Sequence, residues 1–421
     1  MINEIVRQQK AERDNFIKGS YIPREKLEFA GGFLSSKLIK VITGPRRAGK
    51  SVFAFLLLKD KKFAYLNFDD ENLLKVKNYD EFVKSIFEVY GKVDFVFFDE
   101  IQNLENWEVF ANKLQRRGIN LILTGSNAKL LYKEMAARIT GRHIPVEVLP
   151  FSFKEFLAGK NFGVNEDKLK LSDYRGKILN YAAQYLKDGG FPETVVGDIS
   201  VSAYLETLFD AILFKDVVKR NKVRHPQKIY DLAVYTVSNF TCEFTFTRVK
   251  NILNFQSVTT AEKYMSYLED AYLFFPLNRF SFKVKEQMNA PRKIYLADNG
   301  FVAAKAVRFS TDMGRLMENL VFIEILRRGY KLNTEFFYYK NGNGSEVDFL
   351  LKKGTQIEKL IQVCYSVENA YTRKREITSL VKASEKMNCE DLCVITWDEE
   401  SREKIKGKEV VFVPLWKWLA G

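Results

Sequence analysis

The chain has 421 residues, of which 46% are hydrophobic and 14% are aromatic. This length predicts two or three domains, and the aromatic content argues against a disordered chain. The formal net charge is +13, from 66 basic and 53 acidic residues. Such an excess favours an anionic partner, of which nucleic acid is the commonest large one, although a basic surface that only aids solubility fits the charge equally well.

The cysteines, the histidines and the N-terminus narrow the class of protein. The four cysteines and two histidines lack the spacing of a zinc site, and Cys242 and Cys364 follow the pattern of core thiols. The first residues predict a polar amphipathic helix without a signal-peptide core, and no apolar run approaches the roughly 18 residues of a membrane span. We therefore expect a cytoplasmic, reduced protein with no membrane partner.

The segment LIKVITGPRRAGKSVFAFLLL carries the strongest functional signal. Residues 38–43 predict a buried strand and an apolar helix follows from Val52, with G-x-x-x-x-G-K-[ST] between them. Glycines let backbone N–H groups close around phosphate oxygens, and the helix N-terminus adds positive potential. Lys50 is expected to reach the β- and γ-phosphates and Ser51 to ligate Mg²⁺. The predicted nucleotide site consists of Gly44, Pro45, Arg46, Arg47, Ala48, Gly49, Lys50 and Ser51.

A second buried strand is predicted at residues 95–98, in KVDFVFFDEIQNL, and it ends in two carboxylates. Mg²⁺ needs an outer ligand at the C-terminal end of a neighbouring parallel strand, and Asp99 fits that role. Glu100 is then placed to polarise the attacking water. An acidic cap on a core strand is the alternative, and the phosphate loop favours the catalytic interpretation.

Further polar residues are candidates for completing the site. The strand predicted in INLILTGSNAKLL ends near Ser126 and Asn127, which could sense the γ-phosphate or hold the water, although small polar residues commonly end strands. Arg138 and Arg142 precede a strand predicted at residues 144–149. An arginine there could complete the active site of a neighbouring subunit, or it could be a surface residue, and we favour Arg142.

Nine segments occur in order along nearly the whole chain: YIPRE, GPRRAGKS, FFDEIQN, LTGSNAKLL, GR, PFSFKEFL, GGFPE, FKDVVKR and EVDFLL. With them the chain resembles the prokaryotic AAA-type ATPases that join an N-terminal P-loop domain to a C-terminal restriction-endonuclease-like domain. These proteins are grouped with the STAND-like P-loop ATPases. The resemblance implies ATP rather than GTP, with a helical lid and a winged-helix region in the middle, and it implies no particular biological role.

The expected fold is therefore α/β, with four regions. Residues 1–158 form a P-loop ATPase domain with a parallel sheet, and residues 159–225 form a helical lid. Residues 226–300 form a winged-helix-like region. Residues 301–421 form a restriction-endonuclease-like α/β domain of the PD-(D/E)XK type.

The middle of the chain offers candidates for DNA contact. The run DVVKRNKVRHPQK is densely basic, which fits either a solvated linker or contact with a phosphate backbone. Helices and two strands follow, in the plan of a winged helix whose third helix enters the major groove. A helical packing domain without DNA contact is the alternative. The predicted DNA-binding residues are Lys219, Arg220, Lys222, Arg224 and Lys263.

The C-terminal region predicts a helix, a hairpin and a third strand, which is the order of the restriction-endonuclease-like fold. Asp348 fits one metal ligand, and Glu318 on the helix offers a second carboxylate. Such nucleases carry a Glu and a Lys two residues apart, on one face of the next strand. Gln362 and Cys364 stand there and supply neither a carboxylate nor a cation. We expect a degenerate nuclease site, the alternative being a relocated lysine such as Lys340.

Together these features predict a Mg²⁺-dependent ATPase that binds DNA and acts as a homo-oligomer. The catalytic candidates are Lys50, Glu100, Ser126 and Arg142, and the cofactors are ATP and Mg²⁺. An ATP-dependent DNA nuclease is one alternative. A nucleotide-gated scaffold or signalling switch with a protein partner is the other.

Overall fold

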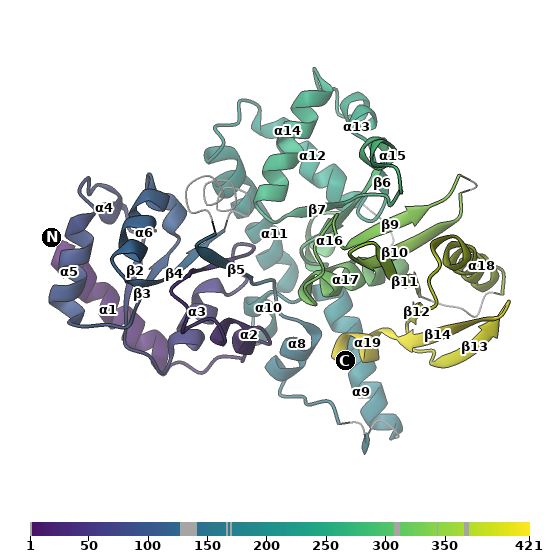
Figure 1. Ribbon diagram of the computed structural model, residues 1–421, viewed down its shortest axis with the longest axis horizontal. Coiled ribbons are helices and arrows are strands. Elements are labelled where there is room, and N and C mark those ends of the chain that lie inside the picture. The colour runs from purple at the N-terminus through teal and green to yellow at the C-terminus, as the bar shows by residue number, and fades with distance from the viewer. Residues whose placement is uncertain are drawn as a thin grey trace. The chain divides into compact units, whose positions relative to one another are not determined.

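The computed structural model describes residues 2–126, 141–165, 167–168, 171–306, 312–342, 344–365 and 370–421 (Figure 1). The chain divides into a first unit, Met1–Phe151 with Asp270–Tyr272, and a second unit, Ser152–Glu269 with Leu273–Gly421. Two candidate site residues, Asn127 and Arg138, lie outside the described residues. No helix in the described ranges is long and apolar enough to cross a membrane.

The first unit is built on a parallel five-stranded sheet with the order β2-β3-β4-β1-β5. Its strands are β1 (Ile39–Thr43), β2 (Phe63–Asn67), β3 (Phe95–Asp99), β4 (Asn120–Gly125) and β5 (His143–Glu147). The expectation that β3 neighbours the phosphate-loop strand β1 was wrong, because β4 pairs with both of them. A crossover connection can pass over a position in a sheet, and a later strand then fills it.

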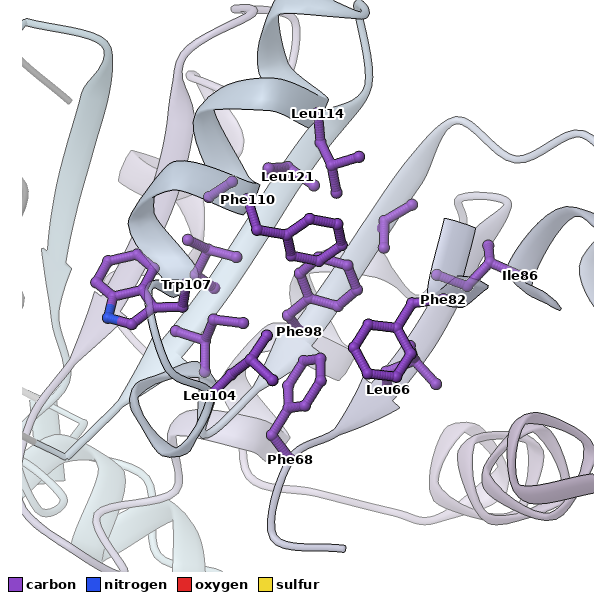
Figure 2. Packing of buried hydrophobic residues seen from close by; sticks show 14 of the residues in the cluster. Leu66, Phe68, Phe82, Ile86, Phe98, Leu104, Trp107, Phe110, Leu114 and Leu121 are labelled. Carbon is purple, nitrogen blue, oxygen red and sulfur yellow. The ribbon is translucent and has the colours of Figure 1, made fainter. Parts of the chain in front are cut away.

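Helices cover both faces of this sheet, so its strands are apolar on both sides. They are α1 (Ile2–Lys18), α2 (Leu27–Gly31), α3 (Lys50–Leu58), α4 (Glu71–Leu74), α5 (Asp80–Tyr90), the 3₁₀ turn η1 (Ile101–Asn103) and α6 (Trp107–Arg116). Val96 and Phe98 of β3 belong to one core cluster, whereas Phe95 and Phe97 belong to the other. Figure 2 shows the first of these clusters, in which the Phe98 ring stacks on Phe110 with centroids 5.7 Å apart.

The second unit begins with helices. They are α8 (Phe153–Gly159), α9 (Ser172–Asp188), α10 (Pro192–Val196), α11 (Val201–Ala211) and the π-helix η3 (Ile212–Lys219). Helix α8 starts at a capping box, in which Ser152 and Glu155 each accept a hydrogen bond from the other's backbone N–H. Helix α9 stops at Gly189, whose φ is +75°. A Cβ atom there would lie 1.6 Å from Oδ1 of Asp298, so glycine is required.

Five helices and a small antiparallel sheet follow in the described residues. The elements are α12 (Pro226–Ser238), β6 (Glu243–Phe244), α13 (Phe246–Ile252), α14 (Val258–Asp270), β7 (Phe274–Leu277), α15 (Val284–Asn289), β8 (Arg292–Leu296) and α16 (Gly300–Lys305). The strand order is β6-β8-β7. The prediction that Cys242 is a buried core thiol was wrong, because the residue is exposed. It follows the end of α12 at the turn into β6, where apolar neighbours in sequence do not imply burial.

The C-terminal part of the second unit contains a six-stranded mixed sheet with the order β13-β14-β12-β11-β10-β9 (Figure 1). Its elements are α17 (Met313–Arg327), β9 (Phe336–Lys340), β10 (Glu346–Lys353), β11 (Gln356–Cys364), α18 (Ala370–Met387), β12 (Leu392–Thr396), β13 (Ser401–Ile405), β14 (Lys408–Pro414) and α19 (Leu415–Ala420). Cys364 is buried in the apolar cluster of this sheet, as expected.

Candidate nucleotide-binding site

The phosphate loop connects β1 to the N-terminus of α3. Two of its glycines have positive φ, +146° at Gly44 and +87° at Gly49, which glycine adopts without strain. A Cβ atom on Gly44 would lie 1.9 Å from the carbonyl oxygen of Val148. The sequence pattern is therefore dictated by close backbone approach as well as by the phosphate.

Arg24, in the YIPRE segment, stabilises this loop through hydrogen bonds. Its buried guanidinium donates to the carbonyl oxygen of Ala48 at 2.9 Å and to that of Leu149 at 2.6 Å. The same group lies over the ring of Phe151. Arg24 therefore links the loop to the segment after β5. Sequence reasoning gave it no role, because the contacts join residues far apart in the chain.

The predicted phosphate and Mg²⁺ ligands converge with Glu100 at the C-terminal edge of the sheet. The Ser51 hydroxyl donates to Oδ1 of Asp99 at 3.0 Å. The Lys50 ammonium donates to the carbonyl oxygen of Pro45 at 3.0 Å and lies 3.9 Å from Oε1 of Glu100. Lys50 and Asp99 are both buried. The two predicted Mg²⁺ ligands are thus adjacent, and they come from α3 and β3.

Thr124, near the end of β4, joins the two carboxylate residues. Its hydroxyl donates to Asp99 and accepts a 2.9 Å hydrogen bond from the backbone N–H of Glu100. The side chain is completely buried. Sequence reasoning favoured Ser126 instead and missed Thr124, since the position of β4 between β1 and β3 was not expected. Glu100 itself has a φ of +51°, an uncommon conformation that this hydrogen bond helps to hold.

Burial raises the pKa of the Asp99 carboxyl to about 6, and the charge of Glu100 acts in the same direction. The hydrogen bonds from Thr124 and Ser51 and the charge of Lys50 act against this increase. A divalent cation would stabilise the ionised carboxylate. The oxygen atoms of Ser51 and Asp99 are hard donors of the kind that Mg²⁺ prefers, so these residues fit the ion.

The Ser126 hydroxyl also lies at this edge, one residue beyond β4. The residue is 1% exposed, and its Oγ atom has no hydrogen-bond partner among the described residues. Buried polar atoms are normally paired. An unpartnered hydroxyl here fits a group that contacts a bound phosphate or water.

Comparison with known proteins identifies the first unit. Residues 36–157 match the AAA domain family AAA_14, and residues 180–312 and 313–418 match two domains of unknown function, DUF8612 and DUF4143. The chain is 37% identical to the uncharacterized protein MJ1544 of Methanocaldococcus jannaschii over 398 residues, which cover 90% of this chain and 88% of that protein. The chain belongs to this family of P-loop ATPases with an AAA domain.

The chain is also 29% identical to an uncharacterized protein of Haemophilus influenzae over 402 residues, covering 91% of this chain and 95% of that protein. Among solved structures, it is similar to the Walker-type ATPase PABY2304 of Pyrococcus abyssi, with 15% identity and a TM-score of 0.42. That match covers 68% of this chain and 98% of the other. The AAA family match confirms the prediction of a P-loop ATPase with ATP as its nucleotide.

The arginine candidates of this ATPase lie in different places. Arg46 is half-buried and Arg47 is exposed, both within the phosphate loop. The Arg142 side chain is exposed, and its carbonyl oxygen accepts from the backbone N–H of Ile39. Arg142 therefore lies at the N-terminal edge of the sheet, about 13 Å of strand away from the phosphate loop. It is too distant to serve the nucleotide site of its own chain.

The residues predicted to bind DNA occupy two segments of the second unit. Lys219 and Arg220 end the π-helix, where Arg220 lies 3.8 Å from Asp216. Lys222 and Arg224 follow and are exposed. Lys263 is exposed on α14, with its ammonium over the Tyr267 ring. All but Arg220 present their charge to solvent.

The four residues of the predicted degenerate nuclease site are buried or half-buried, but the structure divides them. A bulge in β10 between Val347 and Leu350 adds one residue and reorients Asp348. The Asp348 carboxylate accepts from the backbone N–H of Val363 and from Lys293, and Lys293 also contacts Glu318.

Gln362 is directed elsewhere. Its amide nitrogen donates to Glu376 of α18 at 2.8 Å, and its oxygen accepts from the backbone N–H of Asp348. Cys364 packs in the apolar cluster on the α18 side of the sheet. Lys293 thus brings the carboxylates of Glu318 and Asp348 together, whereas Gln362 bonds the backbone of Asp348 and Cys364 packs among apolar side chains. Lys340 pairs with Glu243 and Glu346, outside direct contact with Asp348.

Proposed function

We propose that the protein hydrolyses ATP with Mg²⁺, binds DNA and acts as a homo-oligomer. The observation that carries the catalytic part is the 3.0 Å contact between Ser51 Oγ and Asp99 Oδ1. It places two hard oxygen donors from two elements at the base of the phosphate loop. Bound Mg²⁺ would neutralise charge on the phosphates.

The side chains of this site have separable roles. Lys50 binds the β- and γ-phosphates, exchanging the carbonyl of Pro45 for phosphate oxygens. Glu100 orients the attacking water and accepts its proton. Thr124 is a positioning residue, because it holds Asp99 and the backbone of Glu100 in fixed relation. The unpartnered Ser126 hydroxyl is available to the γ-phosphate or to the water.

Two variants test the catalytic proposal. Lys50→Ala should lose both ATP binding and hydrolysis, because the phosphates lose their buried cation. Glu100→Gln should keep ATP affinity and lose hydrolysis by at least about 100-fold, the usual contribution of a general base. Phosphate release and equilibrium binding of a fluorescent ATP analogue separate the two effects. Wild-type hydrolysis by Lys50→Ala would disprove the assignment.

DNA binding is supported by the order α12-β6-α13-α14-β7-α15-β8, which follows the plan of a winged helix with the short helix α15 between its last two strands. Thr259 and Lys263 are exposed on α14, the helix that would enter the major groove. Lys219, Lys222 and Arg224 would then contact phosphates. The proposal does not include DNA cleavage, because the carboxylates of Asp348 and Glu318 already contact the buried Lys293.

Salt-dependent binding to duplex DNA tests this part. Each lysine that contacts a phosphate should contribute about 0.9 to the slope of log affinity against log salt. Lys222→Ala and Lys263→Ala should each lower the slope, whereas Lys382→Ala, at an exposed position on α18, is the matched control. If the wild-type protein shows no salt-dependent affinity for DNA of any length, a nucleotide-gated switch with a protein partner replaces this proposal.

Oligomerisation is supported by the position of Arg142, which is exposed and distant from the phosphate loop of its own sheet. In an oligomer it would stabilise transition-state charge in a neighbouring subunit. Arg142→Ala should lose activity while keeping ATP affinity. Mixing inactive Arg142→Ala and Lys50→Ala subunits should restore part of the activity, because mixed interfaces contain one intact site. No recovery on mixing, or full activity of Arg142→Ala alone, would exclude the shared site.

A further inference from the structure

Lys293 of β8 carries a buried positive charge in the second unit. The residue is 4% exposed, and its ammonium group contacts three carboxylates. Glu318 lies at 2.9 Å, Glu346 at 2.5 Å and Asp348 at 3.3 Å. Lys293 therefore joins a strand of the middle region to α17 and β10 of the C-terminal region.

Aromatic side chains also contact this cluster of charges. The Tyr295 hydroxyl donates to Glu318 at 2.6 Å, and the Tyr295 ring stacks on Phe322 with centroids 4.1 Å apart. The ring of Tyr338 lies on another side, 5.7 Å from the Lys293 ammonium. The Asp348 carboxylate is thereby buried, whereas the Glu346 side chain remains 29% exposed.

The three neighbouring carboxylates require a compensating cation. Carboxylates that are buried together destabilise a fold unless a cation compensates them, and removing one partner of such a cluster is strongly destabilising. Although burial lowers the pKa of Lys293, the nearby Glu318, Tyr295 and Asp348 outweigh it, and the pKa lies well above its ordinary value. The lysine thus remains charged. In the described part of the chain, no group of acidic, histidine or cysteine side chains is arranged to hold a metal ion.

We propose that Lys293 is an internal counter-ion that compensates the charges of Glu318, Glu346 and Asp348 in the role that a divalent cation plays elsewhere. In this position it links β8 to α17 and β10 and keeps metal ions from the three carboxylates. The proposal is independent of ATP hydrolysis and of DNA binding.

Metal rescue of the full-length protein tests this inference. Lys293→Ala should melt at a lower temperature than the wild type, and millimolar Mn²⁺ should restore much of the loss by binding the freed carboxylates. Lys293→Ala/Glu318→Gln should not be restored. Wild-type protein should show no Mn²⁺-dependent stabilisation that Glu318→Gln removes. Lys353→Ala, at an exposed lysine of β10, is the control and should melt like the wild type.

Three outcomes would overturn the inference. They are a Mn²⁺ site in the wild type that Glu318→Gln abolishes, wild-type stability of Lys293→Ala without metal, and a failure of Mn²⁺ to rescue folded Lys293→Ala. If Lys293→Ala does not fold, Lys293→Met is measured in its place, because its larger apolar side chain leaves less empty volume. Lys293→Met/Glu346→Gln should then be more stable than Lys293→Met, because one uncompensated charge is gone. Equal or lower stability of the double variant would also refute the counter-ion role.

Discussion

Replacement of Thr124 by valine removes one hydroxyl from the catalytic edge and keeps nearly the same volume. In the wild type this hydroxyl donates to Asp99 and accepts from the backbone N–H of Glu100. The side chain is 0% exposed, so water cannot replace either contact. Thr124→Val therefore tests whether the bridge from β4 positions both carboxylates.

The structure sets the expected magnitude. Leaving a buried N–H group unsatisfied costs about 1–3 kcal/mol, and a hydrogen bond to a charged acceptor contributes about 1.5–3 kcal/mol. Partial relaxation makes a total loss of roughly 3 kcal/mol the reasonable expectation for the first unit. A displacement of about 1 Å at the reacting groups costs on the order of 100-fold in rate. Asp99 also loses an interaction that lowers its pKa, which weakens it as a metal ligand.

The assay compares kcat, Mg²⁺ dependence and ATP affinity for Thr124→Val and Thr124→Ser. Valine should lower kcat by about 100-fold and raise the Mg²⁺ concentration needed for half-maximal activity, with ATP affinity changed far less. Serine keeps the hydroxyl and loses one methyl group, so it should cost only about 1 kcal/mol of stability and retain most of the activity. Wild-type activity in Thr124→Val would refute the positioning role. Equal losses in both variants would assign the effect to packing.

Three further predictions concern buried contacts. Arg24→Met leaves the carbonyl oxygens of Ala48 and Leu149 without their donor, at a cost of roughly 2–4 kcal/mol. Calorimetry should therefore show that the first unit melts at a lower temperature. An unchanged transition would contradict the stabilising role of Arg24. Gly44→Ala places a Cβ atom 1.9 Å from the Val148 carbonyl oxygen and should abolish binding of an ATP analogue, whereas normal affinity would show that the loop tolerates the shift. Burial raises the pKa of Asp298 to about 7. The folded chain therefore keeps a proton on this carboxyl that the unfolded chain releases above about pH 4. Because the folded state binds the extra proton, the free energy of unfolding falls as pH rises from about 4 to about 7. The melting temperature of the wild type relative to Asp298→Asn should therefore fall between about pH 4 and about pH 7. The exposed control Glu385→Gln should lack this trend, and a pH-independent difference would exclude the titration.

Local sequence determined the elements of the ATPase site. The apolar run before Gly44 became β1, the run before Asp99 became β3, and the glycines took the positive φ values that the phosphate-loop pattern requires. These features depend on nearest neighbours in the chain, on short apolar runs that are buried on both faces and on the conformational freedom of glycine. The family match then confirmed the ATPase that the pattern predicted.

Other features depended on which distant segments meet. Strand order put β4 between β1 and β3, and so gave Thr124 its bridge to Asp99 and Glu100. A bulge in β10 reoriented Asp348, and β8 delivered Lys293 to it across 55 residues of sequence. Sequence alone predicted a degenerate nuclease site from Gln362 and Cys364, but it did not predict that Lys293 would lie among the carboxylates. Contacts of this kind arise from packing between elements, which local propensity does not encode, so only the tertiary structure decided them.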